Sequence, residues 1–281
     1  MMDGARNRAL LRVQTQVAKV LCMPFTLTHI AAIIPFAAIA PRVLPFSALV
    51  IGSMIPDLPL FVPLPPTYAT THSLIGVFTA CLPLGMACFL TFQYLMKRPL
   101  LALLPDIIRS RCASLSTSCI ELTIGFFALT SLAIVIGAMT HVFWDSFTHQ
   151  GRWGSSVFPR LNDRVLTIQG HKLLGYKALQ YGSTFVLLPC LVILLFIWFS
   201  RQKSGQLDAA QALPKFWRMT LYAIAFLIPI SVTLLTWTGD RRTPYTKLGQ
   251  SITVSGLGLG IFFIAYSICY NVAFRRTYRP G

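Results

Sequence analysis

Five long apolar runs constrain what this chain of 281 residues can fold into. Each is close to the length of about 20 residues that an α-helix needs to cross the hydrocarbon layer of a membrane. Inside a bilayer, such a segment satisfies its backbone hydrogen bonds as a helix or as part of a closed barrel. The sequence therefore predicts five membrane-spanning helices. Four are at residues 74–96, 120–140, 219–237 and 252–273, and the remaining one follows residues 180–184 and ends near residue 199.

Composition supports the same class. The chain is 55% hydrophobic and only 11% charged, whereas a soluble globular domain has about 25% charged residues. The seven cysteines are scattered and form no CxxC pair. They are typical of small buried hydrophobic residues, not of a disulfide framework or a thiolate zinc site.

Two further apolar stretches precede the five runs, at residues 26–40 and 45–63. Both are short for a full span, and prolines interrupt them. We expect short or broken helices packed against the other helices. The predicted fold class is thus all-α, a polytopic transmembrane helix bundle with five spans and two short N-terminal apolar helices. The interrupting residues are Pro35, Pro41, Pro45, Pro56 and Pro59.

The two ends of the chain differ from its middle. Residues 1–22 are polar and basic, and residues 275–281 form a basic C-terminal tail. Between them, residues 23–274 are expected to form a single integral membrane domain. Two interpretations of the N-terminal extension stay open: an interfacial helix, or a native start at Met23 that leaves the extension outside the natural protein.

The net charge of +16 comes from 24 Lys and Arg that lie almost entirely between the apolar runs. This pattern is typical of anchors beside anionic headgroups, and the lipid bilayer is therefore the predicted partner. No basic–aromatic motif of a nucleic-acid module is present, so we expect no nucleic-acid binding. The basic residues divide evenly between alternate loops, and the positive-inside rule does not set the orientation.

The most informative motif is His141–His149, which closes the second of the five runs. His141, Asp145 and His149 are spaced four residues apart, so a helix would place all three on one face. Ionisable groups at the end of a membrane helix are unfavourable unless they pair, face water or bind a metal. This motif therefore predicts a functional site.

Three other ionisable residues lie at ends of apolar stretches. These three residues and the motif at 141–149 come to the same membrane face if both N-terminal stretches cross the bilayer, or if both are re-entrant from one side. The competing interpretation of any single histidine is a capped helix end or an interfacial polar contact. Together the six residues predict one pocket at the membrane boundary: His29, Asp57, His72, His141, Asp145 and His149.

Histidine and carboxylate ligands suit Zn²⁺, Mn²⁺ or Fe²⁺, and zinc is the first expectation. His141 and His149 would be about 12 Å apart along a helix axis, too far for one metal. Three solutions stay open: two metals, a helix break near Ser146, or one histidine outside the ligand shell. Asp145 and Asp57 are the candidate catalytic residues, because either could ligate or bridge a metal that activates water for hydrolysis.

Arg152 and Trp153 follow the motif directly. They could bind a phosphate or lie in the interfacial belt of basic and aromatic residues. The belt is the favoured interpretation.

Five short motifs stand out at the ends of the apolar stretches and beside them: Met23–His29, Gly52–Asp57, Thr71–Ser73, Thr140–His149 and Gln180–Ser183. Over about residues 23–270, they resemble an uncharacterised bacterial membrane family, the domain-of-unknown-function family 4184 (DUF4184). That family is similar in style to bacterial inner-membrane proteins described as predicted metal-dependent hydrolases. The resemblance implies a membrane hydrolase acting on a lipid or phosphoester, with the six His and Asp residues as its site.

Two other functions compete with the hydrolase. A transporter could use the same cluster to relay protons or to bind a metal cargo, and it would need a polar route to the opposite face. A non-catalytic scaffold could hold a structural metal, and it would need a closed coordination shell.

Overall fold

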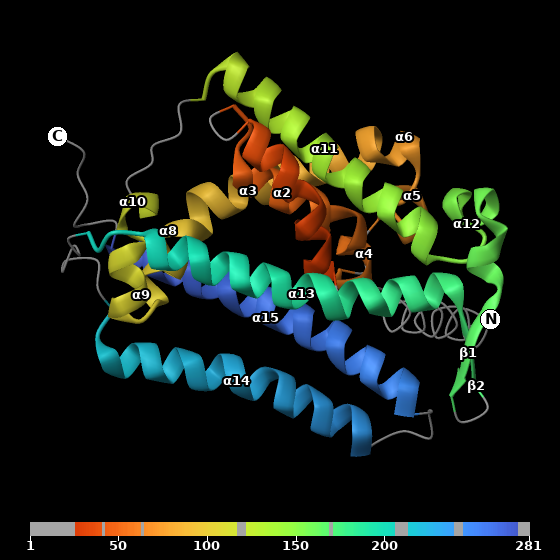
Figure 1. Ribbon diagram of the computed structural model, residues 1–281. Helices are drawn as coiled ribbons and strands as arrows, with labels where there is room; N and C mark the ends of the chain where they lie inside the picture. Colours follow the sequence, from red (N-terminus) through yellow and green to blue (C-terminus); the bar gives the residue numbers. More distant parts are fainter. Residues whose placement is uncertain are drawn as a thin grey trace, which may run out of the picture.

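A computed structural model describes residues 26–40, 43–62, 65–116, 122–168, 171–205, 213–238 and 244–274. The expected N-terminal extension (1–22) and C-terminal tail (275–281) lie outside the described residues. The described chain is helical apart from one small β-hairpin (Figure 1). The predicted all-α fold class is confirmed.

Five helices are long and apolar enough to cross a membrane, as the sequence predicted. The first runs continuously over Leu74–Leu103, through α6 (Leu74–Gly76), a π-helical segment η3 (Val77–Cys81), α7 (Leu82–Leu90), a second π-helical segment η4 (Thr91–Met96) and α8 (Lys97–Leu103). The other four are α11 (Ile124–Thr148), α13 (Gly175–Arg201), α14 (Lys215–Thr238) and α15 (Pro244–Phe274).

The first span is longer than the sequence predicted. A polar segment was expected from residue 97, but the helix continues through α8. Ala102 and Leu103 are buried against Tyr266 and Tyr270 of α15, and the Tyr266 hydroxyl donates to the Pro99 carbonyl at 2.9 Å. Tertiary packing therefore extends the helix past its basic residues.

The two N-terminal apolar stretches form a helical hairpin that packs on α11 (Figure 1). Its first arm is η1 (Thr26–His29) and α2 (Ile30–Ile39); its second is α3 (Phe46–Met54), η2 (Ile55–Asp57) and α4 (Leu58–Phe61). Both arms are short, as the sequence predicted. The hairpin therefore starts and ends near the same end of α11.

The closest helix crossing is between α3 and α11, and two glycines make it possible. A Cβ on Gly52 would lie 2.3 Å from the Ile134 carbonyl oxygen, and a Cβ on Gly137 would lie 2.4 Å from the Leu49 carbonyl oxygen. Small residues at a membrane helix crossing let the two backbones approach closely. Around this crossing lies the main hydrophobic core, which includes Ile33, Leu49, Phe89, Ala133 and Ile134.

The helices α14 and α15 contact the far end of the first span, α15 also contacts α4, and α13 contacts α11 and η1. Asn271 on α15 donates to the Leu95 carbonyl at 2.9 Å. Arg218 on α14 bonds Asp106, at 2.6 Å, on the short helix α9 (Asp106–Arg111). The apolar side chains of α13 and α14 are largely exposed, as expected for helices that face lipid.

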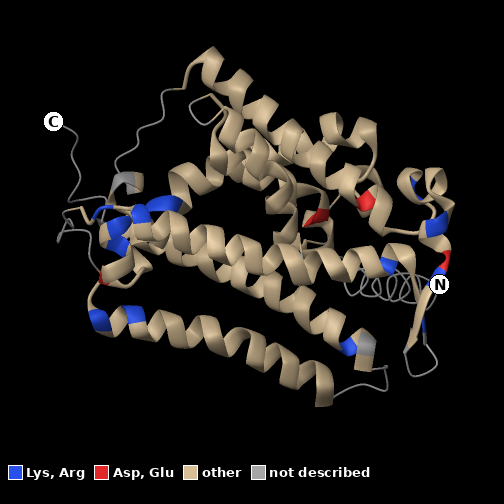
Figure 2. Cartoon of the chain, in the orientation of Figure 1, with Lys and Arg blue, Asp and Glu red and all other residues tan. Residues whose placement is uncertain are grey.

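The loop between α11 and α13 contains short helices and strands that the sequence did not predict. It contains α12 (Trp153–Val157), η5 (Pro159–Asn162) and an antiparallel hairpin of β1 (Arg164–Ile168) and β2 (His171–Leu174). This region lies beyond the C-terminal end of α11 (Figure 1). Lys and Arg gather here and at the opposite end of the bundle, leaving its middle free of them (Figure 2).

The α3–α11 crossing predicts that Gly137→Ala destabilises the protein. The added methyl would clash with the backbone of α3, at 2.4 Å from the Leu49 oxygen and 2.6 Å from the Ser53 nitrogen. We expect a loss of about 1–3 kcal/mol, typical of overpacking, seen as a lower unfolding temperature by circular dichroism. Gly182→Ala on α13 is the control, because a Cβ there meets no atom within 4 Å. Equal stability of the two variants would contradict the close crossing.

Candidate metal centre

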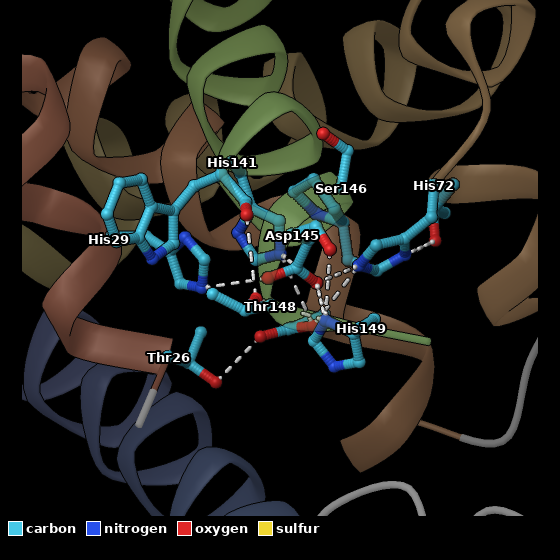
Figure 3. Close-up of polar contacts among 12 residues, drawn as sticks. Thr26, His29, His72, His141, Asp145, Ser146, Thr148 and His149 are labelled. Atoms are coloured by element: carbon cyan, nitrogen blue, oxygen red, sulfur yellow. Dashed lines mark hydrogen bonds and ion pairs between the residues drawn. The ribbon is translucent and has the colours of Figure 1, made fainter. Parts of the chain in front are cut away.

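Four buried side chains from three separate parts of the chain converge on one point (Figure 3). Asp57 ends η2, directly after Pro56. His72 lies in the turn that follows the short helix α5 (Tyr68–Thr71). His141 and Asp145 lie one turn apart near the end of α11. Their exposed fractions are 1% for Asp57, 5% for His72, 0% for His141 and 1% for Asp145.

The spacing of the four groups is short enough for a shared metal ion, since the four candidate ligand atoms all lie within 4.8 Å of one another. His72 Nε2 lies 3.5 Å from Asp57 Oδ1 and 3.3 Å from Asp145 Oδ2. His141 Nε2 lies 3.5 Å from Asp57 Oδ1 and 3.6 Å from Asp145 Oδ2. These distances exceed those of good N–H···O hydrogen bonds. Tetrahedral zinc bonds of roughly 2.0–2.1 Å place neighbouring ligand atoms about 3.3–3.4 Å apart.

The outer nitrogen of each inner histidine is held by a backbone carbonyl. His141 Nδ1 lies 2.7 Å from the Ser53 oxygen, and His72 Nδ1 lies 3.0 Å from the Tyr68 oxygen. A nitrogen that bonds a carbonyl must carry the hydrogen, so in the neutral ring Nε2 presents a lone pair. With both rings neutral, two lone pairs face two carboxylates, an arrangement that a cation between them would stabilise.

Hydroxyl groups hold the carboxylates and the short helix. Thr26 Oγ1 donates to Asp57 Oδ2 at 2.8 Å, which leaves Asp57 Oδ1 for the centre. The Tyr68 hydroxyl donates to Asp145 Oδ2 at 3.4 Å. Thr71 Oγ1 donates to the Pro56 carbonyl at 2.7 Å, which fixes α5 beside η2 and so brings His72 to Asp57.

Sequence reasoning did not identify these supporting residues. Ser53 and Thr71 stand inside the short motifs Gly52–Asp57 and Thr71–Ser73, so a signal for them existed. Tyr68 lies in a stretch expected to be a loop and carried no signal.

Charge balance also fits a divalent cation. Within the described ranges, the buried residues include no Lys, Arg or Glu. Two buried carboxylates without a compensating charge would be strongly unfavourable. Asp57 and Asp145 thus need either shared protons from the histidines or a cation, and the acceptor-only geometry of the four inward atoms fits a cation.

His29 and His149 flank this inner group. The His29 ring stacks on His141 with centroids 3.7 Å apart, and its Nε2 lies 3.6 Å from Asp145 Oδ1. His149 Nδ1 lies 3.2 Å from the Asp145 carbonyl oxygen and 3.6 Å from Asp145 Oδ2. All six predicted residues therefore meet in one cluster, but only four surround the common point.

The course of α11 tests the three solutions left open for the distance between His141 and His149: two metals, a helix break near Ser146, or one histidine outside the ligand shell. The helix is unbroken through Thr148, so a break near Ser146 is wrong. His149 is half-buried, and burial lowers the pKa of this histidine, against the opposing effect of Asp145. Its Nε2 has no hydrogen-bond partner among the described residues. His149 therefore stands at the edge of the centre, outside the group of four.

Five apolar helices and a buried group of two aspartates and two histidines define a polytopic helical membrane protein with a candidate metal centre. The chain belongs to the family described as "Domain of unknown function (DUF4184)", whose model matches residues 23–268. No curated protein and no solved structure matches the chain. The match to the family model confirms the resemblance to DUF4184 that the short sequence motifs indicated.

The geometry predicts that a transition metal stabilises the folded protein. A ligand that binds only the folded state adds about 4 kcal/mol at a thousand times its dissociation constant. We expect Zn²⁺ to raise the unfolding temperature of the chelator-treated protein by about 5–10 °C. Asp57→Asn and Asp145→Asn should abolish this response, whereas Asp163→Asn, an exposed carboxylate outside the cluster, should retain it. The same metal response in all variants would place the binding elsewhere.

Proposed function

We propose that this protein is a membrane-embedded, metal-dependent hydrolase. One observation carries the proposal: two histidine Nε2 atoms and two carboxylate oxygens, all acceptors, face one another at 3.3–3.6 Å in a buried pocket. We propose zinc as the metal, with manganese or iron as alternatives that suit the same ligands. Lipids or other phosphoesters are the proposed substrates.

The chain's own residues would hold and orient this chemistry. A divalent cation supplies a nucleophile at neutral pH by acidifying water, and it polarises a phosphoryl oxygen. Asp57, His72, His141 and Asp145 would hold it, each positioned by one of the bonds described above. These outer bonds fix the direction of each ligand before the metal arrives.

His149 is the residue we assign to proton transfer. Its Nδ1 is anchored at the Asp145 carbonyl, and its Nε2 remains without a partner among the described residues. It is half-buried, whereas the four inner groups are sealed from solvent. A histidine placed in this way can accept a proton from water and return it to a leaving group.

The location of the centre suits substrates of the membrane surface. Asp145 precedes the end of the α11 span by three residues, and His149 directly follows that span. The pocket therefore lies close to the level of the lipid headgroups. We place the protein in the bacterial inner membrane, following the family resemblance.

Two observations favour the hydrolase over its competitors. Among the described residues, every buried histidine and aspartate belongs to this one cluster, so no second buried set supports a transport route. The Nε2 atom of His149 has no hydrogen-bond partner among the described residues, which leaves it for proton transfer, a role that a closed structural metal site does not need.

The metal content of the detergent-purified full chain is the direct test. We expect about one equivalent of a transition metal by mass spectrometry, or two if His29 and Asp145 hold a second ion. Asp145→Ala and His72→Ala should both lose it, and Asp163→Ala should keep it. Wild-type protein without metal, after metal-replete growth and chelator-free purification, would refute the proposal.

If His149 transfers protons without binding the metal, its substitution should lower catalysis and leave metal binding intact. His149→Gln should keep the metal and lower kcat by about 10²–10⁴-fold, as loss of a general acid–base does. Hydrolysis of bis(p-nitrophenyl) phosphate and of short-chain phospholipids by the metal-loaded protein provides the assay. An active His149→Gln variant would remove His149 from the mechanism, and an inactive wild type with metal bound would favour the scaffold.

A further inference from the structure

We propose that Arg152 and the aromatic residues around it bind an anionic phospholipid, with its phosphate at Arg152 and its acyl chains on the aromatic rings. This inference rests on the proposed function and specifies its substrate class. Arg152 would be the residue that selects a phosphate-bearing lipid and presents it to the candidate metal centre.

Arg152 is directed to the centre by the local backbone. The chain leaves α11 at His149 and turns at Gly151, whose φ of +71° is a conformation that favours glycine. This turn brings the Arg152 Nη1 atom to 3.2 Å from the His72 carbonyl oxygen. The guanidinium also lies 5.7 Å from the centre of the Tyr68 ring. Arg152 thus contacts a candidate ligand and a residue that bonds Asp145.

The guanidinium retains capacity to bind an anion. The contact with His72 uses one of its five N–H donors. In the described part of the chain, no carboxylate lies within ion-pair distance of Arg152, whereas Arg109 and Arg218 both pair with Asp106. Arginine binds phosphate through two parallel hydrogen bonds, so this half-buried cation beside the centre suits a phosphate.

An aromatic cluster contains Trp153, the residue that directly follows Arg152 in the chain. Phe143 and Phe147 contact Trp153, with ring centroids 6.3 and 5.9 Å apart, and Phe147 also contacts Phe158. Gly154 lets α12 lie directly on α11, since a Cβ there would lie 2.8 Å from the Phe147 ring. Trp153 is 62% exposed, Phe143 56% and Phe158 54%.

One amphiphile fits both features. Exposed aromatic rings at the end of a membrane helix lie at the level where headgroups meet acyl chains. Arg152 directly precedes Trp153 in the chain, so a phosphate bound at its guanidinium can have its acyl chains over the aromatic cluster. The charge of the guanidinium selects an anionic lipid, and the rings select an acyl chain over a free phosphate.

The test compares two lipids that differ only in the phosphate headgroup. Native mass spectrometry of the metal-loaded full chain in detergent would measure retention of phosphatidylglycerol and of diacylglycerol with the same acyl chains. We expect the wild-type protein to retain phosphatidylglycerol in preference to diacylglycerol. Arg152→Gln should lower this preference about tenfold. Arg160→Gln is the matched control, because Arg160 lies nearby and is exposed. Trp153→Ala should lower retention of both lipids.

Four results would decide the inference. Equal lipid preference in Arg152→Gln and Arg160→Gln, with the metal retained, overturns it. Inorganic phosphate that displaces phosphatidylglycerol at equal concentration also overturns it, because the acyl chains then contribute nothing. If Arg152→Gln loses the metal, the Trp153→Ala variant provides the test instead. Lipid retention in Trp153→Ala equal to that of the wild type then overturns the inference. The wild-type protein can also prove to hold no metal while Arg152→Gln still loses the preference for phosphatidylglycerol. That result supports the lipid site and refutes the metal hydrolase.

Discussion

The structure depends on one electrostatic constraint: two carboxylates are buried in an apolar helical bundle and face the lone pairs of two imidazoles. Asp57 and Asp145 have lost the hydration that would stabilise their charge. The carbonyls of Ser53 and Tyr68 hold the histidine hydrogens on the outer nitrogens. Every inward-facing atom is then an acceptor, and a cation at the centre would relieve the repulsion of all four at once.

The rest of the N-terminal half brings these four groups together. The ligands come from η2, the turn after α5, and α11, so no single element can form the centre. The glycines of the α3–α11 crossing let the Ser53 carbonyl reach His141, and Thr71 ties α5 to η2. The helices α13, α14 and α15 contribute no residue to the ligand set. They add apolar surface that suits a lipid environment.

Burial decreases from the four inner groups outward. The four inner groups are buried, whereas His149 and Arg152 are half-buried. In the proposed function, metal binding, proton transfer and anion binding would follow one another in this order from the pocket outward. The polar turn at Gly151 produces the order, because it returns the chain from the end of α11 toward His72.

The sequence by itself determined the five spans, because length and hydropathy act locally, and it placed His141 and Asp145 on one helical face, because helix periodicity is local too. Counting spans also brought His29, Asp57 and His72 to the same end. Only the tertiary structure decided which four groups surround one point, that His29 stacks on His141 instead, and that Arg152 turns inward. Distances between helices depend on glycine crossings and on carbonyl and hydroxyl contacts from distant segments, which local periodicity does not encode. The extension of α8 and the β-hairpin escaped prediction for the same reason, since contacts far apart in the sequence stabilise them.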